Sequence, residues 1–124
     1  MNSDALIAAA LAQRAQWVDL DGGKRVRVRR PSEHDTRSLI QRDADGKVTG
    51  IAADLPEATR FTVDWEGFTE ADFTPAGASD AVPFSRELWA LWIEDDRQAL
   101  AKVAQAIIDA VIAHETARAG IEKN

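Results

Sequence analysis

The sequence contains no cysteine, which excludes disulfides and thiolate metal sites and leaves packing to hold the fold in any compartment. The apolar run from Ala5 to Leu11 is too short to cross a bilayer. No basic segment precedes it, as one would in a signal peptide. Positive charge is scarce, since 15 Lys and Arg stand against 21 Asp and Glu for a net charge of -6. An acidic chain repels polyanions, so general nucleic-acid binding is disfavoured, and we expect a soluble, cytoplasmic protein.

Signatures of catalysis are also missing. The two histidines, His34 and His114, do not have the spacing of a zinc site. Asp43-Ala44-Asp45-Gly46 resembles the start of a calcium loop, but Asp54 stands where the closing glutamate is needed. No serine lies in the context of a nucleophile elbow. We therefore predict a protein that is not an enzyme, with no catalytic residue, no cofactor and no metal site.

The 124 residues, 45% of them hydrophobic, fit one domain over residues 1–124 with a single core. Capping residues followed by apolar positions three and four apart predict helices, since this spacing places the apolar side chains on one face. These helices are expected at Asp4–Gln16, Glu33–Gln41, Arg86–Glu94 and Arg97–Ala119. The last helix is the longest and ends at Gly120.

Glycine-rich and alternating segments predict the strands. Asp21-Gly22-Gly23 supplies the positive φ values of a tight turn and so predicts a hairpin over residues 17–30. Alternation of Phe61, Val63 and Trp65 with polar residues predicts a strand over residues 60–65, with those three side chains on one buried face. A weaker strand is expected at 48–52, an interruption at Leu55-Pro56 and a long loop at 67–83. The fold class is therefore α+β, a small antiparallel sheet packed against helices.

The segment Lys24 to Arg30 is the one concentration of positive charge. Val26 and Val28 alternate with arginines, so one strand face is apolar and the other basic. The basic face could bind phosphates, but no aromatic residue is interleaved to stack on bases. The simpler interpretation is a charged strand face that discourages edge pairing and is offset by the acids of the later loop. The acidity of the whole chain favours that second interpretation.

Four tryptophans are the remaining candidates for function, because aromatic side chains anchor both cores and interfaces. Trp89 and Trp92 are three residues apart and share a helix face; the core is the favoured place for Trp89, while core and interface stay open for Trp92. Ile108 and Ile112 widen the apolar side of the last helix, which then needs two neighbours or a partner chain. We take Trp89, Trp92, Ile108 and Ile112 as candidate partner contacts.

Residues 63–88 carry a family resemblance. Trp65-Glu66-Gly67 is followed by Glu70, Asp72 and the helix start Val82-Pro83-Phe84-Ser85-Arg86-Glu87. This order is similar to that of the tail assembly chaperones of long-tailed bacteriophages and related prophage proteins. The ending Glu122-Lys123-Asn124 and the segment Val28 to Pro31 are similar too, whereas the loop from Asp72 to Asp80 is longer than the family's turn.

The resemblance implies binding and no reaction. Such chaperones act in the bacterial cytosol, where they hold the long helical tape measure protein soluble while the tail tube protein polymerises around it. A structural tail or head-tail connector subunit is the alternative, and a small nucleic-acid-binding regulator using Lys24 to Arg30 is a weaker one. A homo-oligomer is compatible with each of these functions.

Overall fold

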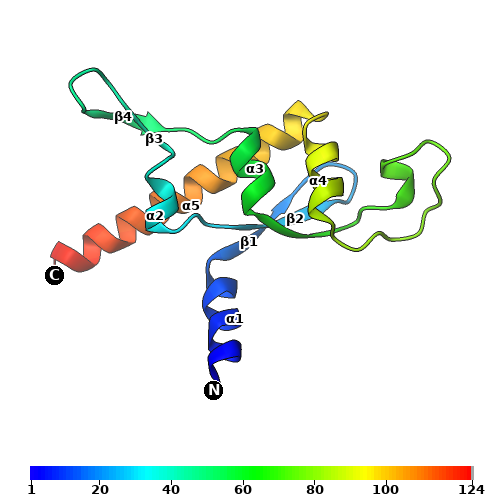
Figure 1. The fold of residues 1–124 in the computed structure, drawn as a ribbon, viewed down its shortest axis with the longest axis horizontal. Helices are drawn as coiled ribbons and strands as arrows, with labels where there is room; N and C mark the ends of the chain where they lie inside the picture. Colours follow the sequence, from blue (N-terminus) through cyan, green and yellow to red (C-terminus); the bar gives the residue numbers. More distant parts are fainter. Residues whose placement is uncertain (124) are drawn as a thin grey trace.

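The computed structural model describes residues 1–123, and Figure 1 shows helices together with two small antiparallel sheets. The expected α+β class, with a long C-terminal helix, is confirmed. The helices are α1 (Ser3–Gln13), α2 (Glu33–Thr36), α3 (Leu55–Phe61), the short 3-10 helix η1 (Glu70–Asp72), α4 (Arg86–Ile93) and α5 (Arg97–Lys123). The strands are β1 (Ala15–Asp19), β2 (Arg25–Arg29), β3 (Ile40–Arg42), β4 (Val48–Ile51) and β5 (Thr62–Glu66).

The larger sheet has the strand order β1-β2-β5, and both neighbouring pairs are antiparallel. β1 and β2 form the hairpin expected at residues 17–30, although β1 begins earlier, at Ala15. Gly22 and Gly23 turn the chain with a φ of 74° each, a value that glycine adopts without steric cost. β5 adds the third strand close to the place expected for residues 60–65.

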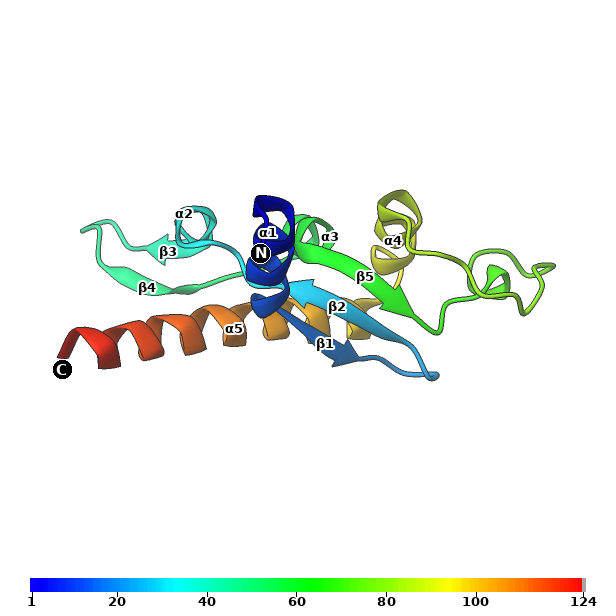
Figure 2. The ribbon, with the colours of Figure 1, turned by 90° about the horizontal axis from the view of Figure 1, so that it is seen from below.

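One face of this sheet lines the core. Val26 and Val28 are buried on it, whereas the alternating Arg25, Arg27 and Arg29 stay half-buried on the opposite face. α3, α4 and α5 contact one another, α5 also contacts β1 and β2, and Figure 2 shows α5 extending along the sheet. Val103 and Ile107 of α5 complete the same core cluster. The long helix therefore serves as the common support of the sheet and of the shorter helices.

A β-bulge changes the predicted burial of β5. Val28 pairs with Thr62 while Arg27 pairs with Asp64, so Val63 is left as an extra residue. Thr62 and Trp65 consequently face the core, and Val63 is only half-buried. The prediction of one buried face for Phe61, Val63 and Trp65 is thus wrong, because Phe61 belongs to α3 and the bulge reverses the alternation.

Residues 33–61 depart most from the prediction. The helix expected at 33–41 ends at Thr36, because Ile40 pairs with Ile51 in the two-stranded sheet of β3 and β4. β4 itself is the strand expected at 48–52. α3 stands where Leu55-Pro56 was expected to interrupt the chain: Pro56 lies in the first turn, where proline is tolerated, and Asp54 with Glu57 forms a capping box.

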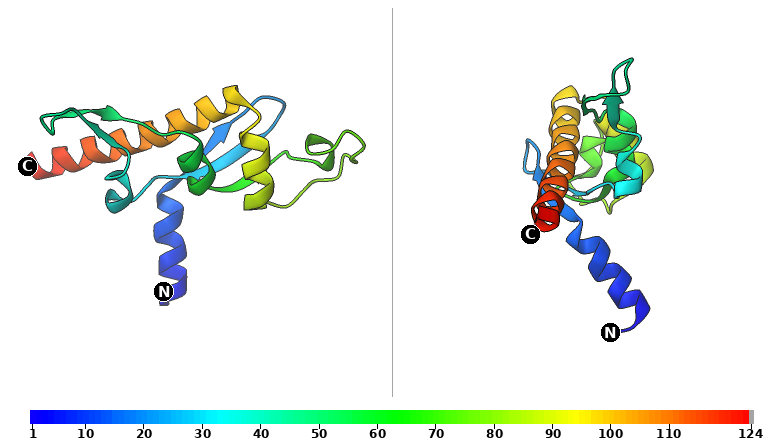
Figure 3. Two further views of the ribbon diagram at one scale, coloured as in Figure 1. Left: turned by 45° about the horizontal axis from the view of Figure 1, so that its top comes forward. Right: turned by 90° about the vertical axis from the view of Figure 1, so that its left-hand side faces the viewer.

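The two terminal helices also differ in length from their predictions. α1 ends at Gln13 rather than Gln16, because Ala15 already pairs with Arg29 in the sheet. α5 continues through Gly120 to Lys123, since Gly120 does not take the positive φ of a C-cap. Figures 1 and 3 show α1 projecting away from the rest of the molecule, and no residue of this helix is buried.

Candidate functional site

An aromatic cluster joins the end of β5 to α4 and decides which tryptophans can reach a partner. Trp65 stacks on Phe68 with ring centroids 4.4 Å apart and donates its indole N–H to the Val82 carbonyl oxygen at 2.7 Å. Trp89 is fully buried and donates to the Ala58 carbonyl oxygen at 3.0 Å. Trp89 was a candidate contact, but its side chain is part of the core, so a partner cannot touch it in this fold.

Trp92 lies at the border between this cluster and solvent. Its ring stacks on Trp89 at 5.7 Å, and its side chain stays half-buried. A surface hollow of about 530 Å³ opens beside it. The apolar wall of this hollow is formed by Phe73, Leu88, Leu91 and Trp92, and its rim includes Asp72, Asp95 and Asp96. We call this site the Trp92 hollow.

Leu91 is the most exposed part of the apolar wall, with 62% of its surface accessible. An exposed leucine beside two aromatic rings leaves apolar area that a partner side chain could cover. α4 places it there because Trp89 and Ile93 on the same short helix are both buried. The helix therefore turns its opposite side, with Leu91, to solvent.

Asp72, on the acidic rim, is held in its charged form by its own contacts. Lys24 approaches the Asp72 carboxylate to 2.8 Å, and the Thr69 backbone N–H donates to it at 2.7 Å. Burial favours the neutral form of Asp72, but these hydrogen bonds outweigh it and lower the pKa of the carboxyl. Asp96 accepts from the Ala99 N–H at 3.0 Å as it caps α5. The hollow thus combines an apolar wall with a negative rim.

Ile108 and Ile112 do not belong to this hollow. Ile108 is half-buried on α5, and 49% of the Ile112 surface is accessible. Neither lines the Trp92 hollow. Of the four candidate contacts, the structure therefore takes Trp89 into the core, leaves Trp92 and Ile108 half-buried at separate places, and exposes Ile112.

The basic strand face is on the outer side of the sheet, away from the core. Arg25 lies 4.2 Å above the Trp17 ring and forms an ion pair with Glu66 at 2.7 Å, which raises the pKa of Arg25 and lowers that of Glu66. Within the described residues, no carboxylate lies within 4.0 Å of Arg27 or Arg29. Glu66 of β5 and Asp72 of the later loop thus pair with Arg25 and Lys24 at one end of the segment, and the other end stays positive.

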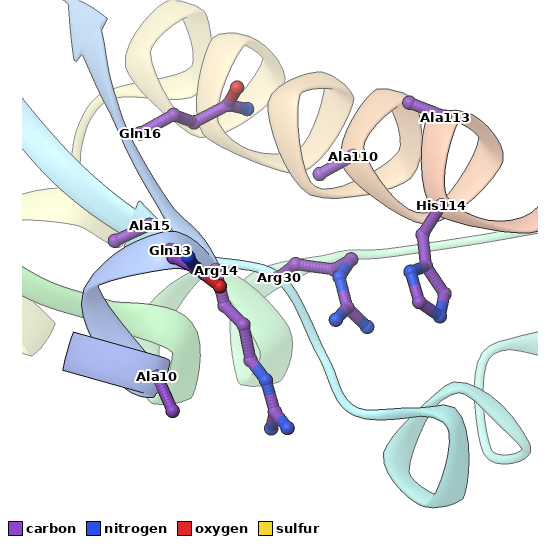
Figure 4. A pocket seen from close by; sticks show the side chains of 9 residues that line it. All are labelled: Ala10, Gln13, Arg14, Ala15, Gln16, Arg30, Ala110, Ala113 and His114. Atoms are coloured by element: carbon purple, nitrogen blue, oxygen red, sulfur yellow. The ribbon is translucent and has the colours of Figure 1, made fainter. Parts of the chain in front are cut away.

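A second hollow, of about 480 Å³, lies between the base of α1 and α5 (Figure 4). Arg14 and Arg30 enter it from the ends of α1 and β2, and His114 faces it from α5. Burial lowers the pKa of Arg30, and the like charge of Arg14 lowers it further. This pair could not be predicted from the sequence, because nothing in the spacing of Arg14 and Arg30 shows that β1 and β2 bring them together.

Glu33 anchors the far part of α5 beside this second hollow. Its carboxylate accepts from His114 Nε2 at 3.0 Å and from the guanidinium of Arg118. These two hydrogen bonds lower the pKa of Glu33, His114 contributing the larger effect. His114 is therefore a half-buried partner of Glu33 rather than a freely solvated helix residue.

The described part of the chain contains no group of three or more His, Asp or Glu side chains that could hold a metal ion. In the same residues, no helix combines the length and the apolar character needed to span a membrane. Comparison with protein-family models, with curated proteins and with solved structures finds no match to this chain.

Proposed function

We propose that this protein is a non-catalytic chaperone of the tail-assembly type, which binds a helical segment of a tape measure protein in the bacterial cytoplasm. The observation that carries the proposal is the Trp92 hollow, an apolar wall with an acidic rim. An amphipathic client helix can place its apolar residues against Leu91 and Trp92 while its lysines and arginines face the rim. The tape measure protein is proposed as the client because the order of motifs in residues 63–88 resembles that of tail assembly chaperones.

Charge also favours this role. The net charge of -6 makes copies of the chain repel one another, which opposes their aggregation while they hold an apolar client. A client with basic residues beside its apolar face is attracted to the rim, whereas an acidic client is repelled. A complex with the tail tube protein would need a surface other than the Trp92 hollow once that hollow is filled.

Coexpression with a tape measure segment tests the proposal. The expected result is a soluble complex that elutes together, and its loss in Leu91→Glu, since a carboxylate on the apolar wall repels the client and cannot be buried. Val48→Glu is the matched control, because Val48 is a similarly exposed apolar residue, 51% accessible, on a different element. An insoluble client with the native chain, or equal binding by both variants, would refute the proposal.

The alternative of a structural tail or head-tail connector subunit is favoured by one observation, the uncovered apolar surface of α1. An uncovered apolar helix leaves surface that a neighbouring subunit of a ring could cover. Formation of closed rings by the pure protein would support this alternative over the chaperone.

A further inference from the structure

α1 is a helix without tertiary support. Leu6, Ile7 and Leu11 expose 59%, 58% and 38% of their surfaces, and every residue from Ser3 to Gln13 is classed as exposed. Isolated helices shorter than about 12 residues are marginal in water, because nucleation is costly and helical stability comes mainly from packing. The 11 residues of α1 therefore need a surface to pack against if the helix is to persist.

The residues of one α1 face indicate what that surface is. Asp4, Ile7, Leu11 and Arg14 follow one another at intervals of three, four and three residues. This is the spacing of a coiled-coil seam, in which positions a and d face a partner helix. The order of intervals is the same when read backwards, so two copies of the seam match when they lie antiparallel.

The chemistry of the seam has the same symmetry. In the antiparallel pair, Ile7 of each copy meets Leu11 of the other, and Asp4 of each copy meets Arg14 of the other. Asp4 is the only charged residue within Ser3–Gln13. No carboxylate of the described residues lies within 4.0 Å of Arg14. A parallel pair would instead place like charges together at both ends.

The base of α1 offers additional complementarity to a second copy. A hollow of about 280 Å³ lies there between Leu11 and the outer face of the sheet, and it is lined by Arg27 and Arg29. An antiparallel partner helix brings its N-terminal end, with Asp4, to this positive end of β2. Because Ala15, the residue after Arg14, pairs with Arg29, the arginines of β2 add positive charge beside the place where Asp4 of the partner meets Arg14.

We propose that α1 is a self-association element, through which two copies of this chain pair as antiparallel helices along Asp4, Ile7, Leu11 and Arg14. The proposal is independent of the Trp92 hollow and of its client. Three helical turns bury less area than the ~1,600 Å² of a standard interface, so the dimer dissociates on dilution. Within an assembly, where local concentration is high, the same contact holds copies together.

Cysteine cross-linking tests the proposed orientation, and the chain offers a clean background because it contains no cysteine. A mixture of Asp4→Cys and Arg14→Cys proteins is expected to form a disulfide-linked dimer under mild oxidation. Asp4→Cys alone is expected to remain monomeric, because the two Asp4 positions lie at opposite ends of the seam, about 15 Å apart. Cross-linking of Asp4→Cys with itself, or no cross-linking in the mixture, would overturn the antiparallel pair.

Sedimentation measures the association itself. Ile7→Asp is expected to weaken dimerisation at least about tenfold, since each dimer loses two buried isoleucines, while Val48→Asp leaves it unchanged. Circular dichroism checks that both variants keep the folded domain. Leu91→Glu is expected to dimerise normally while losing the client. A failure of self-association can therefore be distinguished from a failure of client binding. If the native chain stays monomeric at about 1 mM, the proposal is refuted. This holds even if α1 is found to bind a different protein.

Discussion

Gly67, the glycine of the Trp65-Glu66-Gly67 motif, lies against the turn between β1 and β2, and replacing it tests how far this contact stabilises the fold. Its φ is 86°, and a Cβ placed on it would come within 2.4 Å of the Gly23 carbonyl oxygen and 3.1 Å of the Lys24 Cα. In Gly67→Ala the positive φ costs about 1–2 kcal/mol, and forcing the hairpin backbone aside adds about 1–3 kcal/mol. The expected loss is therefore about 2–5 kcal/mol, a large part of the ~5–15 kcal/mol that stabilises a typical domain.

Gly46 provides the matched control, because it has a similar φ of 80° but no atom within 4 Å of its would-be Cβ. Gly46→Ala should cost only the conformational part, about 1–2 kcal/mol. Urea unfolding followed by tryptophan fluorescence and circular dichroism gives both free energies, with unchanged m values required for the comparison. If the two variants lose the same stability within about 0.5 kcal/mol, the close approach of Gly67 to the hairpin does not constrain the fold.

Two further predictions concern the core and the acidic rim. Trp89→Phe removes the N–H that the Ala58 carbonyl accepts and leaves a space, so unfolding in urea should become easier by about 1–3 kcal/mol without weakening client binding by the folded protein. Weaker binding at unchanged stability would restore Trp89 as a contact. The lowered pKa of Asp72 means that its ion pair with Lys24 stabilises the fold fully above pH 3.8 and less as the pH falls through the carboxyl's lower folded-state pKa. The stability difference between the native chain and Asp72→Asn should therefore shrink in that acidic range, and a difference that stays constant would contradict the assignment.

Local signals in the sequence predicted the elements whose start or turn is written into a few adjacent residues. The hairpin of β1 and β2 depends on Gly22 and Gly23, and α4 begins at Ser85, whose side chain accepts from the Leu88 N–H. α3 differs from the prediction although its capping box is local, because Leu55-Pro56 predicts an interruption of the chain. Proline at the start of a helix removes only an N–H that has no partner there.

Features that depend on distant residues could not be predicted. β3 forms because Ile40 meets Ile51, and the bulge at Val63 arises from the pairing of β5 with β2. The candidate contacts show the same limit. Trp89 and Trp92 share a helix face in the sequence, and both rings contact Phe68. Only the packing of the whole fold shows that Trp89 is enclosed while Trp92 borders solvent.

The core residues are synthesised at different times, and this leaves part of the core exposed in the nascent chain. Val26 and Val28 are made early, but Val103 and Ile107 of the same cluster lie in α5, the last element in chain order. Translation adds about 5–20 residues per second, so several seconds pass between the synthesis of β2 and that of the α5 residues that cover the inner face of the sheet. During that interval the nascent protein exposes an apolar strand pair, and the three arginines on the reverse face of β2 are then its main protection against pairing with another chain.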